Sequence, residues 1–71
     1  MAKQEKNLMQ KTVDDLITYI IDHNMRPGDK LPNEQVLSEL VNAGRSTIRE
    51  AMRTLATRNI VEIRQGSGTY I

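Results

Sequence analysis

The chain has no cysteine, tryptophan or phenylalanine, and it holds a single histidine and two tyrosines. Without cysteine it can form neither a disulfide nor a thiolate metal site, and one histidine provides no cluster of metal ligands. Two aromatic rings are too few to stack a series of bases, which argues against single-strand binding. The sequence also shows no nucleotide-binding loop and no pair of acids expected to share a pocket. We therefore expect no metal, no cofactor and no enzymatic activity.

Long apolar runs are also lacking. No stretch approaches the roughly 18–20 apolar residues that span a bilayer. No apolar segment follows the lysines near the N-terminus, as a signal peptide would require. These features predict a cytoplasmic chain with no membrane partner. With 71 residues, 38% of them hydrophobic, the chain has the size and composition of one small globular domain.

The charged residues are unevenly distributed along the chain. Residues 1–44 hold seven acids and five cations, a net charge of −2, whereas residues 45–71 hold two acids and five cations, a net charge of +3. All five cations of the second segment are arginines, whose planar guanidinium suits bidentate contacts with phosphate and guanine. This pattern fits a nucleic-acid partner or an ordinary solvated basic face, and charge alone does not separate the two.

Apolar residues recur with helical spacing in three segments. The first helix is expected to begin at Met9 and to span about four turns. The second begins after Pro32 with Asn33 as its N-cap, and the third covers residues 45–58. The residues expected to be buried are Met9, Val13, Leu16, Ile17, Ile20 and Ile21 in the first helix, Val36, Leu37, Leu40 and Val41 in the second, and Ile48, Ala51, Met52, Leu55 and Ala56 in the third.

The spacing changes to two after the third helix, which predicts a strand with Val61 and Ile63 on one face and Glu62 and Arg64 on the other. Residues 65–68 form the expected hairpin loop, because two glycines there accept positive φ. In the turn at residues 25–32, Leu31 is the apolar residue expected to reach the core. The order of elements predicts a mainly α fold with a small β-hairpin: a winged helix-turn-helix with three helices and a two-stranded wing.

Three segments resemble the N-terminal DNA-binding domain of the GntR family of bacterial transcription regulators. They are residues 27–34 (Pro-Gly-Asp-Lys-Leu-Pro-Asn-Glu), residues 45–51 (Arg-Ser-Thr-Ile-Arg-Glu-Ala) and residues 64–70 (Arg-Gln-Gly-Ser-Gly-Thr-Tyr). The resemblance covers residues 9–71, which we expect to form the domain, and residues 1–8 are expected to form a flexible arm.

This sequence departs from the family pattern at three positions. Asn33 stands in place of serine, and both residues cap helices well. Asn42 stands in place of glycine in the turn, and asparagine also accepts positive φ. Gly44 stands in place of serine before the third helix, which removes a side-chain cap and a hydroxyl that could contact phosphate.

The resemblance implies sequence-specific binding of double-stranded DNA by a transcription regulator, expected to be a repressor. It places the recognition helix, residues 45–58, in the major groove and the wing, residues 64–70, at the minor groove. It also implies a homodimer on a palindromic operator. Family members dimerise and bind a small-molecule effector through a C-terminal domain, which this chain is expected to lack.

The expected DNA contacts lie mainly on the exposed face of the third helix. Arg45 and Arg49 are four residues apart and so lie side by side, where both are expected to reach base edges. No acid on the same helix faces Arg49, whereas Glu50 is expected to pair with Arg53. The complete set of expected contacts is Arg45, Ser46, Thr47, Arg49 and Arg53 in the third helix, Gln65, Gly66 and Ser67 in the wing, and Gln35 in the second helix.

A winged helix can also serve as a protein–protein interaction module. That alternative predicts that the exposed arginines are not needed for binding to nucleic acid.

Overall fold

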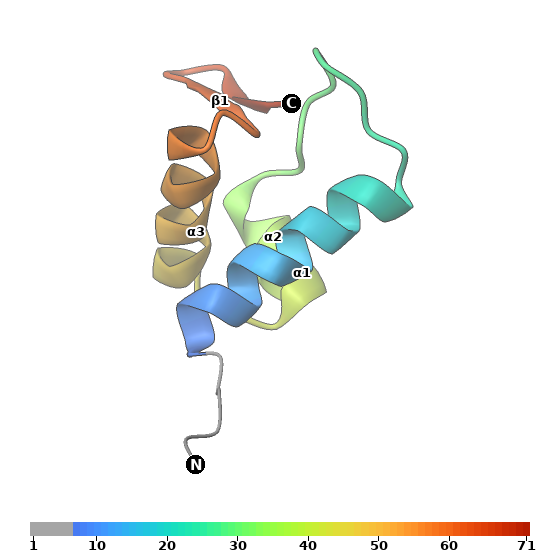
Figure 1. The fold of residues 1–71 in the computed structure, drawn as a ribbon. Helices are drawn as coiled ribbons and strands as arrows, with labels where there is room; N and C mark the ends of the chain where they lie inside the picture. Colours follow the sequence, from blue (N-terminus) through green and yellow to red (C-terminus); the bar gives the residue numbers. More distant parts are fainter. Residues whose placement is uncertain (1–6) are drawn as a thin grey trace.

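The computed structural model describes residues 7–71, which form three helices followed by a β-hairpin (Figure 1). This arrangement confirms the predicted mainly α winged helix-turn-helix with a two-stranded wing. Residues 1–6 of the expected arm lie outside the described residues, and the first helix begins one residue earlier than predicted. The elements are α1 (Leu8–Asp22), α2 (Glu34–Val41), α3 (Arg45–Thr57), β1 (Glu62–Arg64) and β2 (Gly68–Tyr70).

Asparagine residues cap the starts of α1 and α2, and an asparagine with positive φ lies at or just after the end of each helix. The side chains of Asn7 and Asn33 accept hydrogen bonds from backbone N–H groups three residues further on, at the starts of α1 and α2. Asn24, Asn42 and Asn59 follow the three helices with φ values of 51°, 55° and 61°. Asparagine tolerates this left-handed conformation better than other residues with a side chain. The sequence predicted the cap at Asn33 and the positive φ at Asn42, and both are confirmed.

The N-cap of α3 is a glycine. Gly44 has an ordinary φ of −67° and makes no side-chain hydrogen bond to the helix. We expect Gly44→Ser to raise the free energy of unfolding by about 0.3 kcal/mol, because the serine hydroxyl accepts a bond from a free N–H group. Thermal unfolding followed by circular dichroism measures this change. Gly44→Ala adds a side chain without a hydrogen-bond acceptor and is the control. A serine variant that is no more stable than the parent chain would contradict the expectation.

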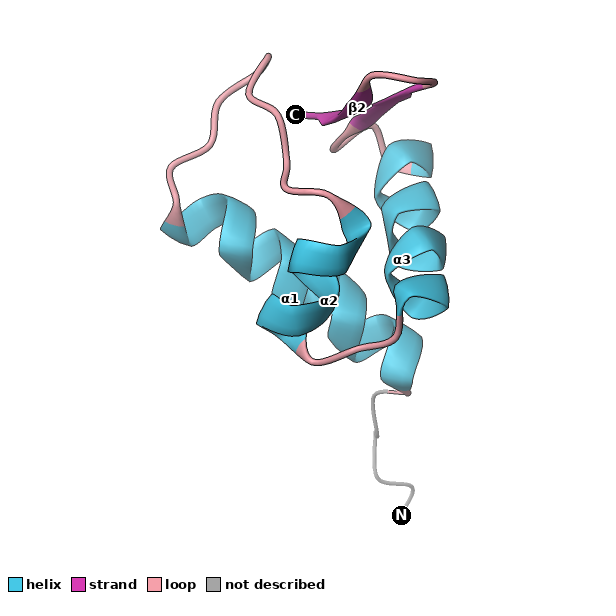
Figure 2. Cartoon of the chain, turned by 180° about the vertical axis from the view of Figure 1, so that it is seen from behind, coloured by secondary structure: helices cyan, strands magenta, loops and turns pink. Residues whose placement is uncertain are grey.

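One face of each helix contributes to the core. α1 and α2 both pack against α3, and Figure 2 shows the short turn that joins α2 to α3. Leu31 reaches the core from the loop before α2 and is 3% exposed, as predicted. The buried apolar residues are Val13, Leu16, Ile20, Leu31, Leu37, Ile48, Ala51, Met52, Leu55 and Val61.

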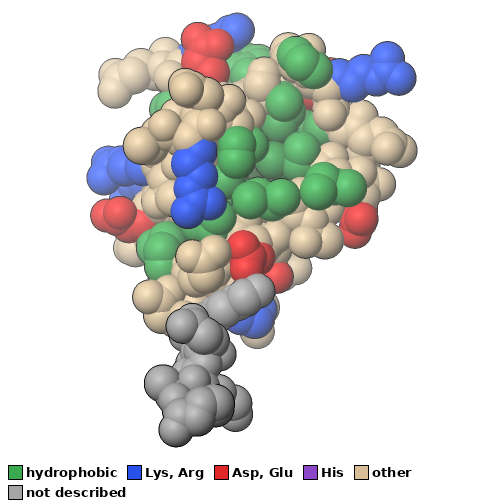
Figure 3. Space-filling model, in the orientation of Figure 1, with side chains coloured by type: hydrophobic (Ala, Val, Ile, Leu, Met, Phe, Trp, Pro, Cys, Tyr) green, Lys and Arg blue, Asp and Glu red, His purple; other side chains and the backbone are tan. Residues whose placement is uncertain are grey.

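Three residues that the sequence pattern placed in the core are exposed instead: Ile21, Val36 and Leu40 have exposed fractions of 66%, 41% and 56%. Ile63 of the wing is 45% exposed. A periodic pattern identifies an apolar face, but the neighbouring elements determine how much of that face is covered. α2 has eight residues, and Leu37 is the one it buries completely. Hydrophobic side chains accordingly remain at the surface, and Figure 3 shows several gathered on one face.

The wing is joined to the loop between α1 and α2. β1 and β2 are antiparallel, and Lys30 forms a further β-bridge with Tyr70. The backbone N–H of Leu31 donates to the carbonyl of Thr69 at 2.8 Å, and the N–H of Ile71 donates to the carbonyl of Asp29 at 2.8 Å. The β-bridge and these two backbone hydrogen bonds therefore hold the loop against the edge of the hairpin. The sequence pattern did not predict this contact.

Candidate nucleic-acid interface

The recognition helix divides into a buried face and an exposed face, as its periodicity predicts. Its buried residues are Ile48, Ala51, Met52 and Leu55. The exposed face carries Arg45, Ser46, Arg49 and Arg53, with Thr47 half-buried beside them. The first turn of α3 also leaves backbone N–H groups without helical partners, which favours an anion there.

Arg49 has a partner that lies outside its own helix. Its Nε donates to Oε2 of Glu34 at 3.1 Å, and its Nη2 donates to Oε1 of the same carboxylate at 3.0 Å. Helical spacing within α3 does not reveal this pair, since Glu34 is the first residue of α2. Helix packing brings the two residues together across fifteen positions of sequence.

The contact with Arg49 is the main reason that the pKa of Glu34 lies below its ordinary value of 4.5, and Arg45 and Arg53 lower that pKa further. The same hydrogen bonds raise the pKa of Arg49. A carboxyl group with a lowered pKa stabilises the folded state at pH values above its ordinary pKa. That contribution is lost as the pH falls through the lowered pKa.

We expect the Arg49→Ala substitution to raise the pKa of Glu34 towards 4.5, because it removes the largest stabilising contact of the carboxylate. An NMR titration of the Glu34 side-chain carboxyl carbon in the parent and the variant measures this shift. Lys11→Ala, which removes a cation from the α1 surface, is the control and should leave the Glu34 midpoint unchanged. An unchanged midpoint in Arg49→Ala would show that the ion pair is not formed in solution.

The remaining arginines near this surface make looser contacts. Arg53 lies 4.0 Å from Glu50, one turn earlier on α3, as predicted. Arg64 lies 3.3 Å from Glu62 and over the ring of Tyr70, with 4.3 Å between the guanidinium carbon and the ring centroid. All four charged side chains are at least half exposed, and such pairs contribute little to stability. Both arginines are therefore available to a partner.

The tip of the wing is exposed and held in a fixed conformation. Gln65, Gly66 and Ser67 are exposed, and Gly66 has a φ of +75° that glycine adopts easily. The Ser67 hydroxyl forms a 2.6 Å hydrogen bond with the Tyr70 hydroxyl, which ties the loop to β2. Tyr70 therefore supports the wing.

A groove of about 590 Å³ lies between the start of α2, the exposed face of α3 and the wing. Four cations and one acid line it: Lys30, Arg49, Arg53, Arg64 and Glu34. The predicted contacts that line it are Arg49, Arg53, Gln65, Gly66 and Ser67, whereas Arg45, Ser46, Thr47 and Gln35 lie outside its lining. The structure thus brings the recognition helix and the wing to one basic concave surface.

Lys30 and Glu34 line this groove although neither was predicted to contact DNA. Lys30 lies across Gly68: a Cβ atom placed on that glycine would be 2.6 Å from the lysine Cε. No acid lies within ion-pair distance of Lys30 in the described part of the chain. Lys30 belongs to the motif at residues 27–34, so the sequence drew attention to this segment. Its position beside the wing depends on the β-bridge between Lys30 and Tyr70.

No group of three or more potential metal ligands is found in residues 7–71. No helix in the described part of the chain is both long and apolar enough to cross a bilayer.

Known proteins with similar sequences are bacterial regulators. The family model of the bacterial regulatory proteins of the gntR family matches residues 8–71. The mannosyl-D-glycerate transport/metabolism system repressor MngR of Escherichia coli (strain K12) is 38% identical over 66 residues, which cover 93% of this chain and 28% of that protein. The transcriptional regulator LutR of Bacillus subtilis (strain 168) is 45% identical over 47 residues, which cover 66% of this chain and 22% of that protein.

Solved structures show the same fold. Streptococcus agalactiae GntR superposes with a TM-score of 0.87 at 58% identity, over 90% of this chain and 31% of that one. The DNA-binding domain of AraR, solved in complex with operator ORX1, superposes with a TM-score of 0.85 at 22% identity, over 100% of this chain and 86% of that one. This chain spans less than a third of the length of MngR, LutR and Streptococcus agalactiae GntR. The chain belongs to the gntR family of bacterial regulatory proteins, and residues 8–71 are the winged helix-turn-helix DNA-binding domain of such a transcription regulator.

Proposed function

We infer that this domain binds operator DNA sequence-specifically, with α3 in the major groove and the wing at the adjacent minor groove. The observation that carries this proposal is the single basic groove between α3 and the wing. A helix presented with its polar face outward fits the width of the major groove. The wing beside it then lies over the neighbouring phosphates and the minor groove.

Arg45 and Arg49 are assigned to base edges. Both are exposed on the first two turns of α3, which in helix-turn-helix proteins contact the bases. Their guanidinium groups fit the O6 and N7 acceptors of guanine. Ser46 and Thr47 lie at the helix N-terminus, where a hydroxyl and the free N–H groups together suit a phosphate.

The other predicted residues are assigned to the DNA backbone and the minor groove. Arg53 lies one turn beyond Arg49 and Gln35 is exposed in the first turn of α2, so both are suited to phosphate. Gln65, Gly66 and Ser67 form the tip of the wing, which is assigned to the minor groove. Lys30 is added to this set because it lines the groove and has no acid within ion-pair distance among residues 7–71; its assigned contact is a phosphate.

The whole regulator is proposed to act in the cytoplasm as a homodimeric repressor on a palindromic operator. One domain of this size makes few base contacts, and two copies on a symmetric site supply the affinity that a regulator needs. The chain spans 28% of the length of MngR, which is named a repressor. The remainder of such a protein has room for a domain that dimerises and binds a small-molecule effector.

The proposal is tested by fluorescence anisotropy of this chain with duplexes selected from a random library, at about 50 and 200 mM salt. Arg49→Ala is expected to weaken binding to the selected duplex by about 1–3 kcal/mol and to relax selectivity at one base pair. Lys30→Ala is the comparison: it should weaken binding to every duplex alike and reduce the salt slope by about 1.

The alternative function, a protein–protein interaction module, predicts a different result in the same assay. Binding to DNA would then be weak, unselective and indifferent to Arg49→Ala. That outcome would falsify the assignment of α3 to the major groove.

A further inference from the structure

The ion pair between Glu34 and Arg49 connects α2 directly to the recognition helix. Two nitrogens of the guanidinium, Nε and Nη2, face the two oxygens of the carboxylate at 3.1 and 3.0 Å. The side chain of Arg49 is 50% exposed and that of Glu34 is 35% exposed, so the pair lies at the surface of the groove and not beneath it. Two parallel charge-assisted bonds restrict the guanidinium more strongly than a single contact would.

This geometry leaves one edge of Arg49 free. A guanidinium carries five N–H donors, and Glu34 engages those on the Nε side. The opposite edge, formed by Nη1 and the second hydrogen of Nη2, still presents a fork of two donors. Such a fork matches the O6 and N7 acceptors of guanine. Arg49 can therefore bind Glu34 and a base at the same time.

The ion pair is not needed to hold α2 in place. Leu37 anchors α2 in the core with no exposed surface, and Asn33 caps its first turn. An exposed ion pair adds little to such an anchor. An acid in a groove that faces phosphate, moreover, weakens the attraction to any DNA. Its position is better explained by what it does to Arg49.

We propose that Glu34 is a positioning residue for base recognition: it orients the free edge of Arg49 towards a guanine and neutralises the charge that would otherwise draw Arg49 to phosphates. This proposal rests on the proposed function, since it assumes that Arg49 contacts a base. In this proposal Glu34 and Arg49 together select one base pair. Glu34 lowers the affinity for DNA of any sequence and raises the selectivity for that base pair.

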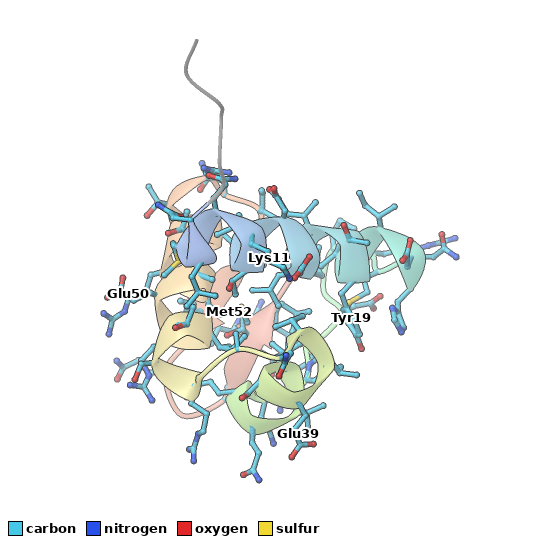
Figure 4. The ribbon with its side chains drawn as sticks, turned by 90° about the horizontal axis from the view of Figure 1, so that it is seen from below. Lys11, Tyr19, Glu39, Glu50 and Met52 are labelled. Carbon is cyan, nitrogen blue, oxygen red and sulfur yellow. The ribbon has the colours of Figure 1, made fainter. Side chains whose placement is uncertain are left out.

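The test compares Glu34→Gln with Glu39→Gln in the anisotropy assay. Glu39 lies on the same helix but points away from the fold, so its variant removes the same charge outside the groove (Figure 4). For Glu34→Gln we expect selectivity at the Arg49 base pair to fall about tenfold. Binding to unrelated duplexes should become tighter, and the salt slope should steepen by about 0.9, as Arg49 becomes free to reach a phosphate. Glu39→Gln should leave selectivity unchanged.

Two further variants separate orientation from charge. Glu34→Asp keeps the charge but shortens the side chain, so selectivity should fall without the steeper salt slope. In an Arg49→Ala background, Glu34→Gln should no longer change selectivity at that base pair, because Glu34 acts through the arginine. Unchanged helical circular dichroism confirms that each variant is folded.

The outcomes distinguish this proposal from the function on which it rests. A parent chain that binds all duplexes alike, or is indifferent to Arg49→Ala, overturns the proposed function and this proposal with it. A selective parent whose Glu34→Gln variant is equally selective overturns only the role of Glu34. If Glu34→Gln lowers the affinity for every duplex by the same factor, the ion pair only stabilises the fold. If Glu34→Gln still changes selectivity in the Arg49→Ala background, Glu34 contacts a base directly. Either result overturns the positioning role of Glu34.

Discussion

Replacing Leu55 with alanine is expected to lower the free energy of unfolding by about 2–5 kcal/mol. Leu55 lies on the buried face of α3 and has no exposed surface. Removing its branched end forfeits the burial of those atoms and leaves a cavity that the surrounding helices fill incompletely. A domain of this length has a total stability of about 4–11 kcal/mol, so one substitution removes a large share. Urea denaturation followed by circular dichroism measures the loss.

Leu40→Ala is the matched control for this experiment. It is the same substitution in another helix, but Leu40 is 56% exposed on α2. Its effect should stay within about 0.5 kcal/mol, as for most surface changes. Similar losses at the two positions would contradict the structure, because they would place Leu40 in the core, where the sequence pattern alone had put it.

Gly68→Ala is expected to destabilise the wing by about 1–3 kcal/mol. Gly68 begins β2 with a φ of +141°, a conformation that residues with a side chain rarely adopt. The new Cβ would also lie 2.6 Å from Cε of Lys30. The end of a lysine side chain moves easily, so the backbone strain accounts for most of the cost, and the displaced lysine loses its place at the groove. Affinity for DNA should fall while the helical circular dichroism signal is kept.

Gly66→Asn is the control for the stability of the wing, compared by thermal unfolding and not by DNA affinity, because Gly66 is itself assigned to the minor groove. Gly66 has a φ of +75° and no atom within 4 Å of an added Cβ. Asparagine already adopts positive φ at three other positions of this chain, so it should fit at position 66 with little loss of stability. Equal losses of stability in the two variants would show that the φ of Gly68 and its contact with Lys30 do not set it apart from Gly66.

The ends of the elements were predictable because they depend on neighbours in sequence. An Asn33 side chain reaches the backbone three residues ahead, and Asn42 takes the left-handed conformation by itself. The same holds for the two glycines of the wing. These interactions between residues close in sequence give the fold class. They also place the arginines of α3 on its exposed side, whichever element packs on the other side of the helix.

The groove depended on contacts between distant segments. Lys30 reaches the wing only because the loop before α2 forms a β-bridge with β2. Glu34 meets Arg49 only because α2 and α3 pack against each other. No periodicity in the sequence carries information about either contact.

The sequence by itself determined which residues form helices, which form the hairpin and which face of α3 is polar. Hydrogen bonds within a few residues and apolar periodicity are enough for that. Only the tertiary structure decided that Val36 and Leu40 stay exposed and that Arg49 has an acidic partner. The physical reason is that coverage and ion pairing depend on how separate elements dock, and docking is settled by the shape of the whole core.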